Sequence, residues 1–149
     1  MTVSRSPAGP HDGSVVVDLD RQECLDLLAE GDLGRVAVSR PGRAPLVLLA
    51  TYRLEGETIV FCTNDGATFD ALCAAPISLE VDAVDPFHHT GWTVLVEGDA
   101  SEVPPGEVDT DLHPWIGGGE RHLVRIRPDL ITGRRVTSTG FHVDARGYL

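Results

Sequence analysis

The pattern of apolar and polar residues changes from a helical to an extended period early in this 149-residue chain. Residues 20–31, DRQECLDLLAEG, predict a helix whose apolar residues form one stripe. Asp20 is the expected N-cap, Glu23 completes a capping box, and Gly31 is the expected left-handed residue that ends the helix. The stripe that must pack on something consists of Cys24, Leu25, Leu27 and Leu28.

From residue 34 onward, apolar residues recur at every second position. Residues 34–39, 46–53 and 58–63 read as strands separated by the turn-like sequences RPGRAP and LEGE, which predicts a three-stranded meander. The second stretch, LVLLATYR, is apolar on both faces. We therefore expect it to be central in the sheet or covered on both sides.

The remaining pattern adds one helix and several strands. We expect a helix over 67–75, ending before Pro76, and a short strand near the start over 15–19. Further strands are expected over 77–84, over 91–103 as the longest strand, and over 121–128 and 131–137 as a final hairpin. Six or seven antiparallel strands with two short flanking helices indicate a mainly β protein built as a small closed barrel.

Length and composition limit the organisation and the partners. Residues 14–137 fit one domain, between a disordered arm at 1–13 that is rich in Pro, Gly and Ser and a loose tail at 138–149. A net charge of -11 with no basic stripe argues against nucleic acid. No apolar window is long enough for a membrane span, and the start lacks a signal-peptide core, so we expect a cytoplasmic protein.

The sequence contains no recognisable catalytic motif, and no catalytic residue is assigned. Neighbours His88 and His89 point to opposite faces of an extended segment, so no metal site is predicted. Glu80 and Asp82 are expected to face solvent, and the three cysteines to be small buried hydrophobes. Five arginines cluster near the end of the chain, where ion pairing and an anion site both remain open: Arg121, Arg125, Arg127, Arg134 and Arg135.

Residues 63–72, TNDGATFDAL, follow an apolar strand and open a helix. A helix N-terminus offers unpaired N–H groups and a positive dipole end to an anion. This one carries Asp65 and Asp70 and no basic residue. It is either a phosphate site without its cation or a capped helix without a ligand.

Several segments in order are together similar to one family: ECLDLLAEGDLGRVAVS, LVLLATY, TIVFCTNDGATFDAL, LEVDAVDP, TGWTVLVEGDASEV and LVRIRPDLITGRR. They resemble the pyridoxamine 5'-phosphate oxidase-like flavoproteins with an FMN-binding split barrel, in particular their short actinobacterial branch. The likeness covers residues 20–136. It implies a split-barrel homodimer with two flavin sites at the subunit interface, and FMN or a deazaflavin as cofactor.

The resemblance also implies which residues bind the flavin. The ring would lie along LVLLATY, bonded at its edge by main-chain groups near Leu49, Ala50 and Thr51. Trp92 and Thr93 would reach in from the partner subunit. The phosphate end would be formed by Thr63 and the loop 64–69, with Asn64, Thr68 and Phe69.

Phe69 occupies the position at which relatives usually carry a phosphate-binding lysine. Loss of one charge-assisted phosphate contact removes about 1.5–3 kcal/mol, or one to two decades of affinity. We expect a flavin-dependent oxidoreductase acting on a small molecule. True pyridoxamine 5'-phosphate oxidase activity is not expected, because the basic loop residues and a matching C-terminal segment are missing. A non-catalytic flavin or haem binder and a cofactor-free dimer remain open, although the histidine spacing does not support haem.

Overall fold

The computed structural model describes residues 13–138 except 65, 109–110 and 116. The N-terminal segment predicted to be disordered, 1–13, and the tail predicted at 138–149 lie outside the described residues, apart from Gly13 and Ser138. In the described part, the elements in chain order are β1 (Ser14–Leu19), α1 (Arg21–Glu30), β2 (Leu33–Val38), β3 (Leu46–Glu55), β4 (Thr58–Thr63), α2 (Gly66–Ala74), β5 (Ile77–Asp85), β6 (Thr90–Glu102) and β7 (His122–Ser138). Neither helix is long and apolar enough to cross a membrane.

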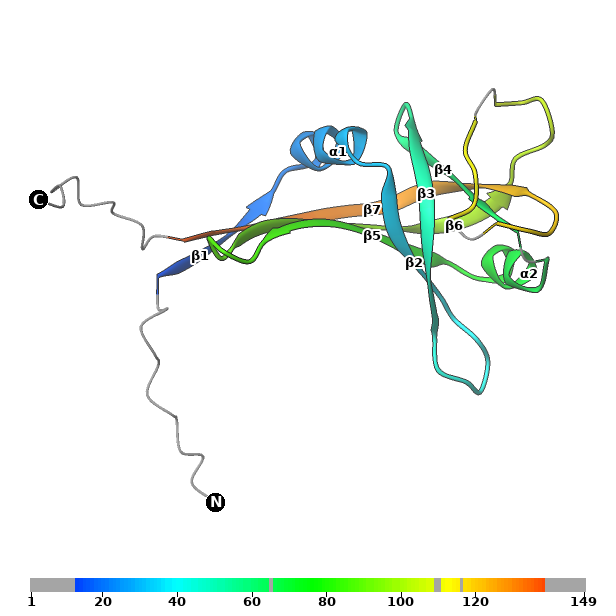
Figure 1. Ribbon diagram of the computed structural model, residues 1–149, viewed down its shortest axis with the longest axis horizontal. Helices are drawn as coiled ribbons and strands as arrows, with labels where there is room; N and C mark the ends of the chain where they lie inside the picture. Colours follow the sequence, from blue (N-terminus) through cyan, green and yellow to red (C-terminus); the bar gives the residue numbers. More distant parts are fainter. Residues whose placement is uncertain (1–12, 65, 109–110, 116, 139–149) are drawn as a thin grey trace, which may run out of the picture.

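Six strands form a closed antiparallel barrel, and β1 is an additional strand. The sheet order is β1-β7-β4-β3-β2-β5-β6, and a further pairing of β6 with β7 closes the ring. β1 pairs only with the far half of β7, outside the ring (Figure 1). The predicted mainly β split barrel with two short helices is confirmed, as is the meander of β2, β3 and β4.

Helix α1 begins as predicted but ends differently. Asp20 caps it and Glu23 completes the capping box. Gly31 is extended (φ -88°, ψ 165°), so the predicted left-handed end is wrong. The hydroxyl of Tyr52 on β3 donates to the Leu28 carbonyl at 2.7 Å, and a Cβ on Gly31 would lie 2.5 Å from that hydroxyl oxygen. Glycine is needed there because the Tyr52 hydroxyl approaches so closely.

The predicted final hairpin is wrong, because residues 122–138 form one continuous strand, β7, which is also longer than β6. The register between β6 and β7 shifts where Glu97 faces Leu130 and Gly98 faces Pro128. Proline has no N–H to donate, and a β-bulge is a place within a sheet that tolerates it. The apparent turn at Pro128 is therefore a bulge that bends the strand.

Strand β3 is central in its meander, but one of its faces is open. Ala50 and Tyr52 are buried in the core, whereas Val47 is 60% exposed and Leu49 is 44% exposed. The alternative expectation, that β3 is covered on both sides, does not hold within one chain. Its outer face is available to a ligand or a second chain.

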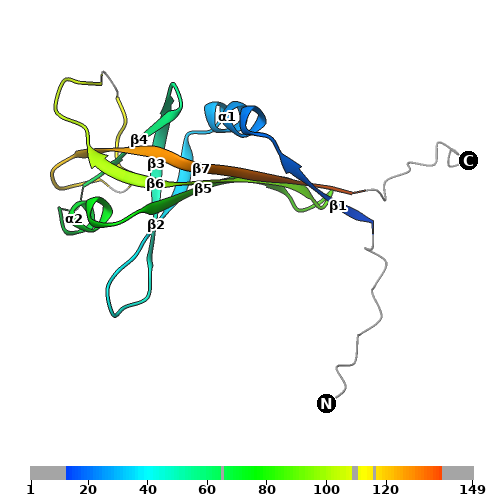
Figure 2. The same ribbon diagram turned by 180° about the vertical axis from the view of Figure 1, so that it is seen from behind.

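The molecule has two parts, which we call the barrel and the arm. The arm consists of β1, residues 82–93 at the end of the β5–β6 hairpin, and residues 133–138 of β7. It projects on one side, and α2 lies at the opposite end of the barrel, as both views show (Figures 1 and 2). Several large apolar residues of the arm are exposed: Val15, Val16, Val17, Val84 and Phe87.

Candidate functional site

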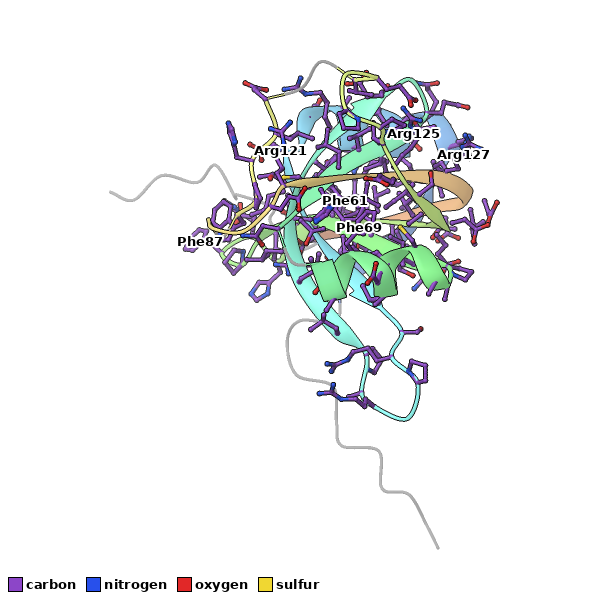
Figure 3. All side chains as sticks on the ribbon, turned by 90° about the vertical axis from the view of Figure 1, so that its right-hand side faces the viewer. Phe61, Phe69, Phe87, Arg121, Arg125 and Arg127 are labelled. Atoms are coloured by element: carbon purple, nitrogen blue, oxygen red, sulfur yellow. The ribbon has the colours of Figure 1, made fainter. Side chains whose placement is uncertain are left out.

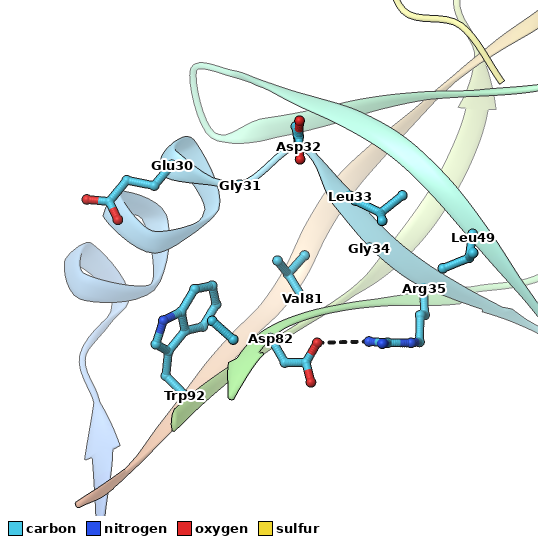
Figure 4. Close-up of a pocket in the computed structure, with 11 residues that line it drawn as sticks. Glu30, Gly31, Asp32, Leu33, Gly34, Arg35, Leu49, Val81, Asp82 and Trp92 are labelled. Atoms are coloured by element: carbon cyan, nitrogen blue, oxygen red, sulfur yellow. Dashed lines mark hydrogen bonds and ion pairs between the residues drawn. The ribbon is translucent and has the colours of Figure 1, made fainter. Parts of the chain in front are cut away.

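A hollow of about 460 Å³ lies where the barrel meets the arm. Leu49 on β3 and Trp92 on β6 lie on opposite sides of it (Figure 4). Backbone at the end of α1 and the start of β2 forms much of the remaining wall, together with Val81 and Ala83. The structure thus brings together one residue from each of two predicted cofactor segments.

An ion-pair network forms one side of this hollow. The Arg35 guanidinium donates to Asp82 at 2.8 Å and to Glu80 at 3.1 Å, and both carboxylates raise the pKa of Arg35. The Thr93 hydroxyl donates to the second oxygen of Glu80 at 3.0 Å. Glu80 and Asp82 lie on the outer face of β5, as expected, and their side chains, each 32% exposed, are paired there with Arg35.

Sequence reasoning missed Arg35 as a site residue. It lies directly across from Glu80 in the β2–β5 register. Charge alternation on 77–84 opposite a basic residue on 34–39 could have indicated the pairing, but only once the order of strands was known. The network orders the Thr93 side chain at the edge of the site.

Phe69, at the lysine position, packs inward from α2. Its ring, labelled in Figure 3, stacks on that of His122, and the ring centroids lie 4.6 Å apart with planes inclined at 21°. It also packs against the main core that includes Phe61. The ring therefore occupies space at the predicted phosphate end without offering a hydrogen-bond donor to an anion.

The described residues of the connection between β6 and β7, residues 103–121, bond two of the predicted polar residues. The Thr51 hydroxyl donates to the His113 carbonyl, and the Asn64 amide donates to the Gly118 carbonyl. Leu112 anchors the connection in a small second core with Val60 and Cys62. Predicted cofactor groups on β3 and after β4 are thus bonded to the protein's own chain.

The predicted site residues fall into two groups within one chain. Leu49, Trp92 and Thr93 lie where barrel and arm meet, and Trp92 and Thr93 also line a groove on the arm. Ala50 is fully buried, so only its main chain can serve a ligand. The phosphate-end residues end β4, follow it directly or belong to α2, away from the arm: Thr63, Asn64, Thr68 and Phe69.

The arginines are spread along β7, with Arg121 directly before it, rather than gathered at one point. Arg125 and Arg127 share a face as predicted, and Arg125 pairs with Glu107 at 2.7 Å. Arg121 donates to the Leu112 carbonyl, and Arg134 lies 3.7 Å from Asp18. Local ion pairing accounts for part of the predicted cluster.

Two of the three cysteines are buried as expected, and Cys73 is not. Cys24 and Cys62 lie in the two cores, whereas Cys73 on α2 is exposed. Desolvation by burial raises the pKa of all three thiols. The exposure of Cys73 corrects the prediction, because its helix packs only one face on the barrel.

The aromatic part of a flavin fits these residues better than its phosphate does. An open apolar strand face at Leu49 and an indole at Trp92 suit a flat ring. The phosphate end has hydroxyl and main-chain donors at the start of α2, but a phenylalanine stands in the lysine position. Bound flavin would supply redox chemistry, and these residues would hold and shield its ring.

Comparison with known proteins places the chain in a family. The model of the pyridoxamine 5'-phosphate oxidase family matches residues 20–135. A protein of Mycobacterium tuberculosis, described as uncharacterized, is 34% identical over 140 residues, covering 88% of this chain and 92% of its own length. The chain belongs to the pyridoxamine 5'-phosphate oxidase family, as its sequence motifs predicted.

Solved structures show the same fold. An FAD-binding protein from Mycobacterium smegmatis is 28% identical, with a TM-score of 0.65 over 81% of this chain and 98% of that one. An FAD-binding protein from Mesorhizobium loti has a TM-score of 0.69 over 85% of this chain and all of its own, at 21% identity. The second likeness shows the fold alone.

Proposed function

We propose that this protein binds a flavin, FMN or a deazaflavin, between two copies of the chain and serves as an oxidoreductase for a small molecule. The carrying observation is the open apolar outer face of β3, where Val47 is 60% exposed and Leu49 is 44% exposed. A flat ring against an apolar wall with main-chain groups at its edge suits flavin binding. A similar protein described as FAD-binding supports this proposal.

The proposed dimer accounts for the exposed apolar residues of the arm. Trp92 and Thr93 lie at its base, and the phosphate-end residues lie at the other end of the same chain (Figure 1). In the proposal, the arm of one copy reaches the β3 face and α2 of the other. Exposed large apolar residues gathered on one part of a protein mark interaction sites.

Titration of the full chain with FMN and riboflavin tests the proposal. Phe69→Lys restores a cation at the phosphate end, so FMN should bind about 10- to 100-fold more tightly while riboflavin affinity is unchanged. Phe69→Leu controls for the lost stack on His122. Equal FMN affinity in both variants would show that position 69 does not face the phosphate.

One observation favours a second candidate, a dimeric scaffold without cofactor. The Phe69–His122 stack and the bond from Asn64 to the Gly118 carbonyl occupy the phosphate end with the protein's own groups, and the Thr51 hydroxyl, at the predicted edge of the ring, is bonded to the His113 carbonyl. A purified dimer that is colourless and takes up neither FMN nor a deazaflavin would support this alternative. Flavin absorbance bands that appear on titration would exclude it.

A further inference from the structure

The arm carries a second groove, distinct from the hollow that contains Leu49. It has a volume of about 550 Å³ and lies between β1 and the β5–β6 hairpin. Its walls are formed mainly by Val16, Val84, Val136 and the Trp92 indole. An apolar groove with one aromatic wall suits part of a flat organic ligand.

One guanidinium enters this apolar groove. Arg134 lines it and lies directly across from Thr93 in the β6–β7 register. Its ion pair with Asp18 is long, at 3.7 Å, and the two side chains are 71% and 90% exposed. Exposed pairs of this kind contribute little, so the guanidinium can exchange Asp18 for a ligand anion.

Asp82, the carboxylate that lines the groove, already has a cationic partner. Asp82 accepts from Arg35 at 2.8 Å, and Arg35 also bonds Glu80. An anion entering the groove therefore meets the charge of Arg134 before that of a free carboxylate. Guanidinium is also the side chain best shaped to bind phosphate through two hydrogen bonds.

We propose that Arg134 binds the phosphate of the flavin nucleotide and replaces the cation that is missing at Phe69. This inference rests on the proposed function, because the groove and α2 lie at opposite ends of one chain (Figure 1). Arg134 thus serves the site of the second copy. In that dimer, Arg134 reaches the second copy's site together with Thr93, its cross-strand neighbour, and Trp92.

The test compares FMN with riboflavin, which has the same ring and no phosphate, on the full chain. Arg134→Gln should weaken FMN about 10- to 100-fold and leave riboflavin within about twofold, because one charge-assisted phosphate contact is lost. Arg127→Gln is the matched control, an exposed arginine on the same strand but outside the groove, and should change neither affinity. Asp18→Asn removes the competing carboxylate and should tighten FMN severalfold.

The outcomes separate this inference from the proposed function. Wild-type protein that binds FMN, with unchanged affinity in Arg134→Gln, would overturn the role of Arg134 and leave the proposed function standing. Equal loss of FMN and riboflavin in Arg134→Gln would also overturn it, since Arg134 would then shape the groove rather than bind phosphate. Wild-type protein that binds neither FMN, riboflavin nor a deazaflavin would remove both proposals.

Discussion

Apolar side chains of the same sheet are buried in the barrel but exposed on the arm. Phe61 on β4 is fully buried in the barrel, whereas Val84 on β5 keeps 67% of its surface exposed on the arm. The barrel closes on itself through the β6–β7 pairing, and its two helices cover further surface. The arm extends past β2, β3 and β4, and its exposed valines are not covered by any other part of the chain that the structure describes. The barrel therefore carries the stability, and the arm is left for recognition.

The largest expected effect is a difference in the free energy of unfolding between a barrel variant and an arm variant. Phe61→Ala should lower the free energy of unfolding by about 3–5 kcal/mol, because it leaves a cavity in a closed core. Val84→Ala should stay within about 0.5 kcal/mol under the same conditions at low protein concentration. Urea unfolding followed by circular dichroism measures both. A large loss in Val84→Ala would mean that the arm is packed within one chain.

The second prediction concerns the bulge at which β7 passes from the barrel toward the arm. A Cβ on Gly98 would clash with the Arg127 carbonyl, a backbone group that cannot turn away. Gly98→Ala should therefore cost about 3 kcal/mol, the upper end for overpacking. Gly66→Ala, where a Cβ meets nothing within 4 Å, is the control and should be near neutral. A melting temperature unchanged in both would contradict the close approach.

The third prediction uses the hydroxyl that joins β3 to α1. Burial, with a smaller contribution from Asp32, raises the pKa of Tyr52 from 10.0 to about 12. Because the folded pKa lies above the ordinary value, the stabilisation is complete below pH 10 and is lost as pH rises from 10 through 12. Tyr52→Phe leaves the Leu28 carbonyl without this donor and should cost about 1–3 kcal/mol.

The free energy of unfolding, measured for wild type and Tyr52→Phe across pH 8–12, checks this pH dependence. The difference between them should be constant up to pH 10 and shrink above it. A difference that does not depend on pH would show that Tyr52 ionises at its ordinary pKa.

Local patterns in the sequence determined the elements and the family. Period-two alternation set the strands over 77–84 and 91–103, and Asp20 with Glu23 set the start of α1. Such signals act between residues a few positions apart, so they can be recognised without knowing the fold. The β4–α2 junction with Phe69 was visible for the same reason.

Only the tertiary structure decided the features that depend on distant residues. Gly31 is extended because Tyr52 lies against it, and Pro128 lies in a bulge because β6 continues alongside it. Arg35 became a site residue only when β2 was paired with β5. Register and closure place such partners 20 to over 40 positions apart in the chain, as Tyr52–Leu28 (24) and Arg35–Glu80 (45) show. No local period records such contacts, because they arise from how the strands assemble.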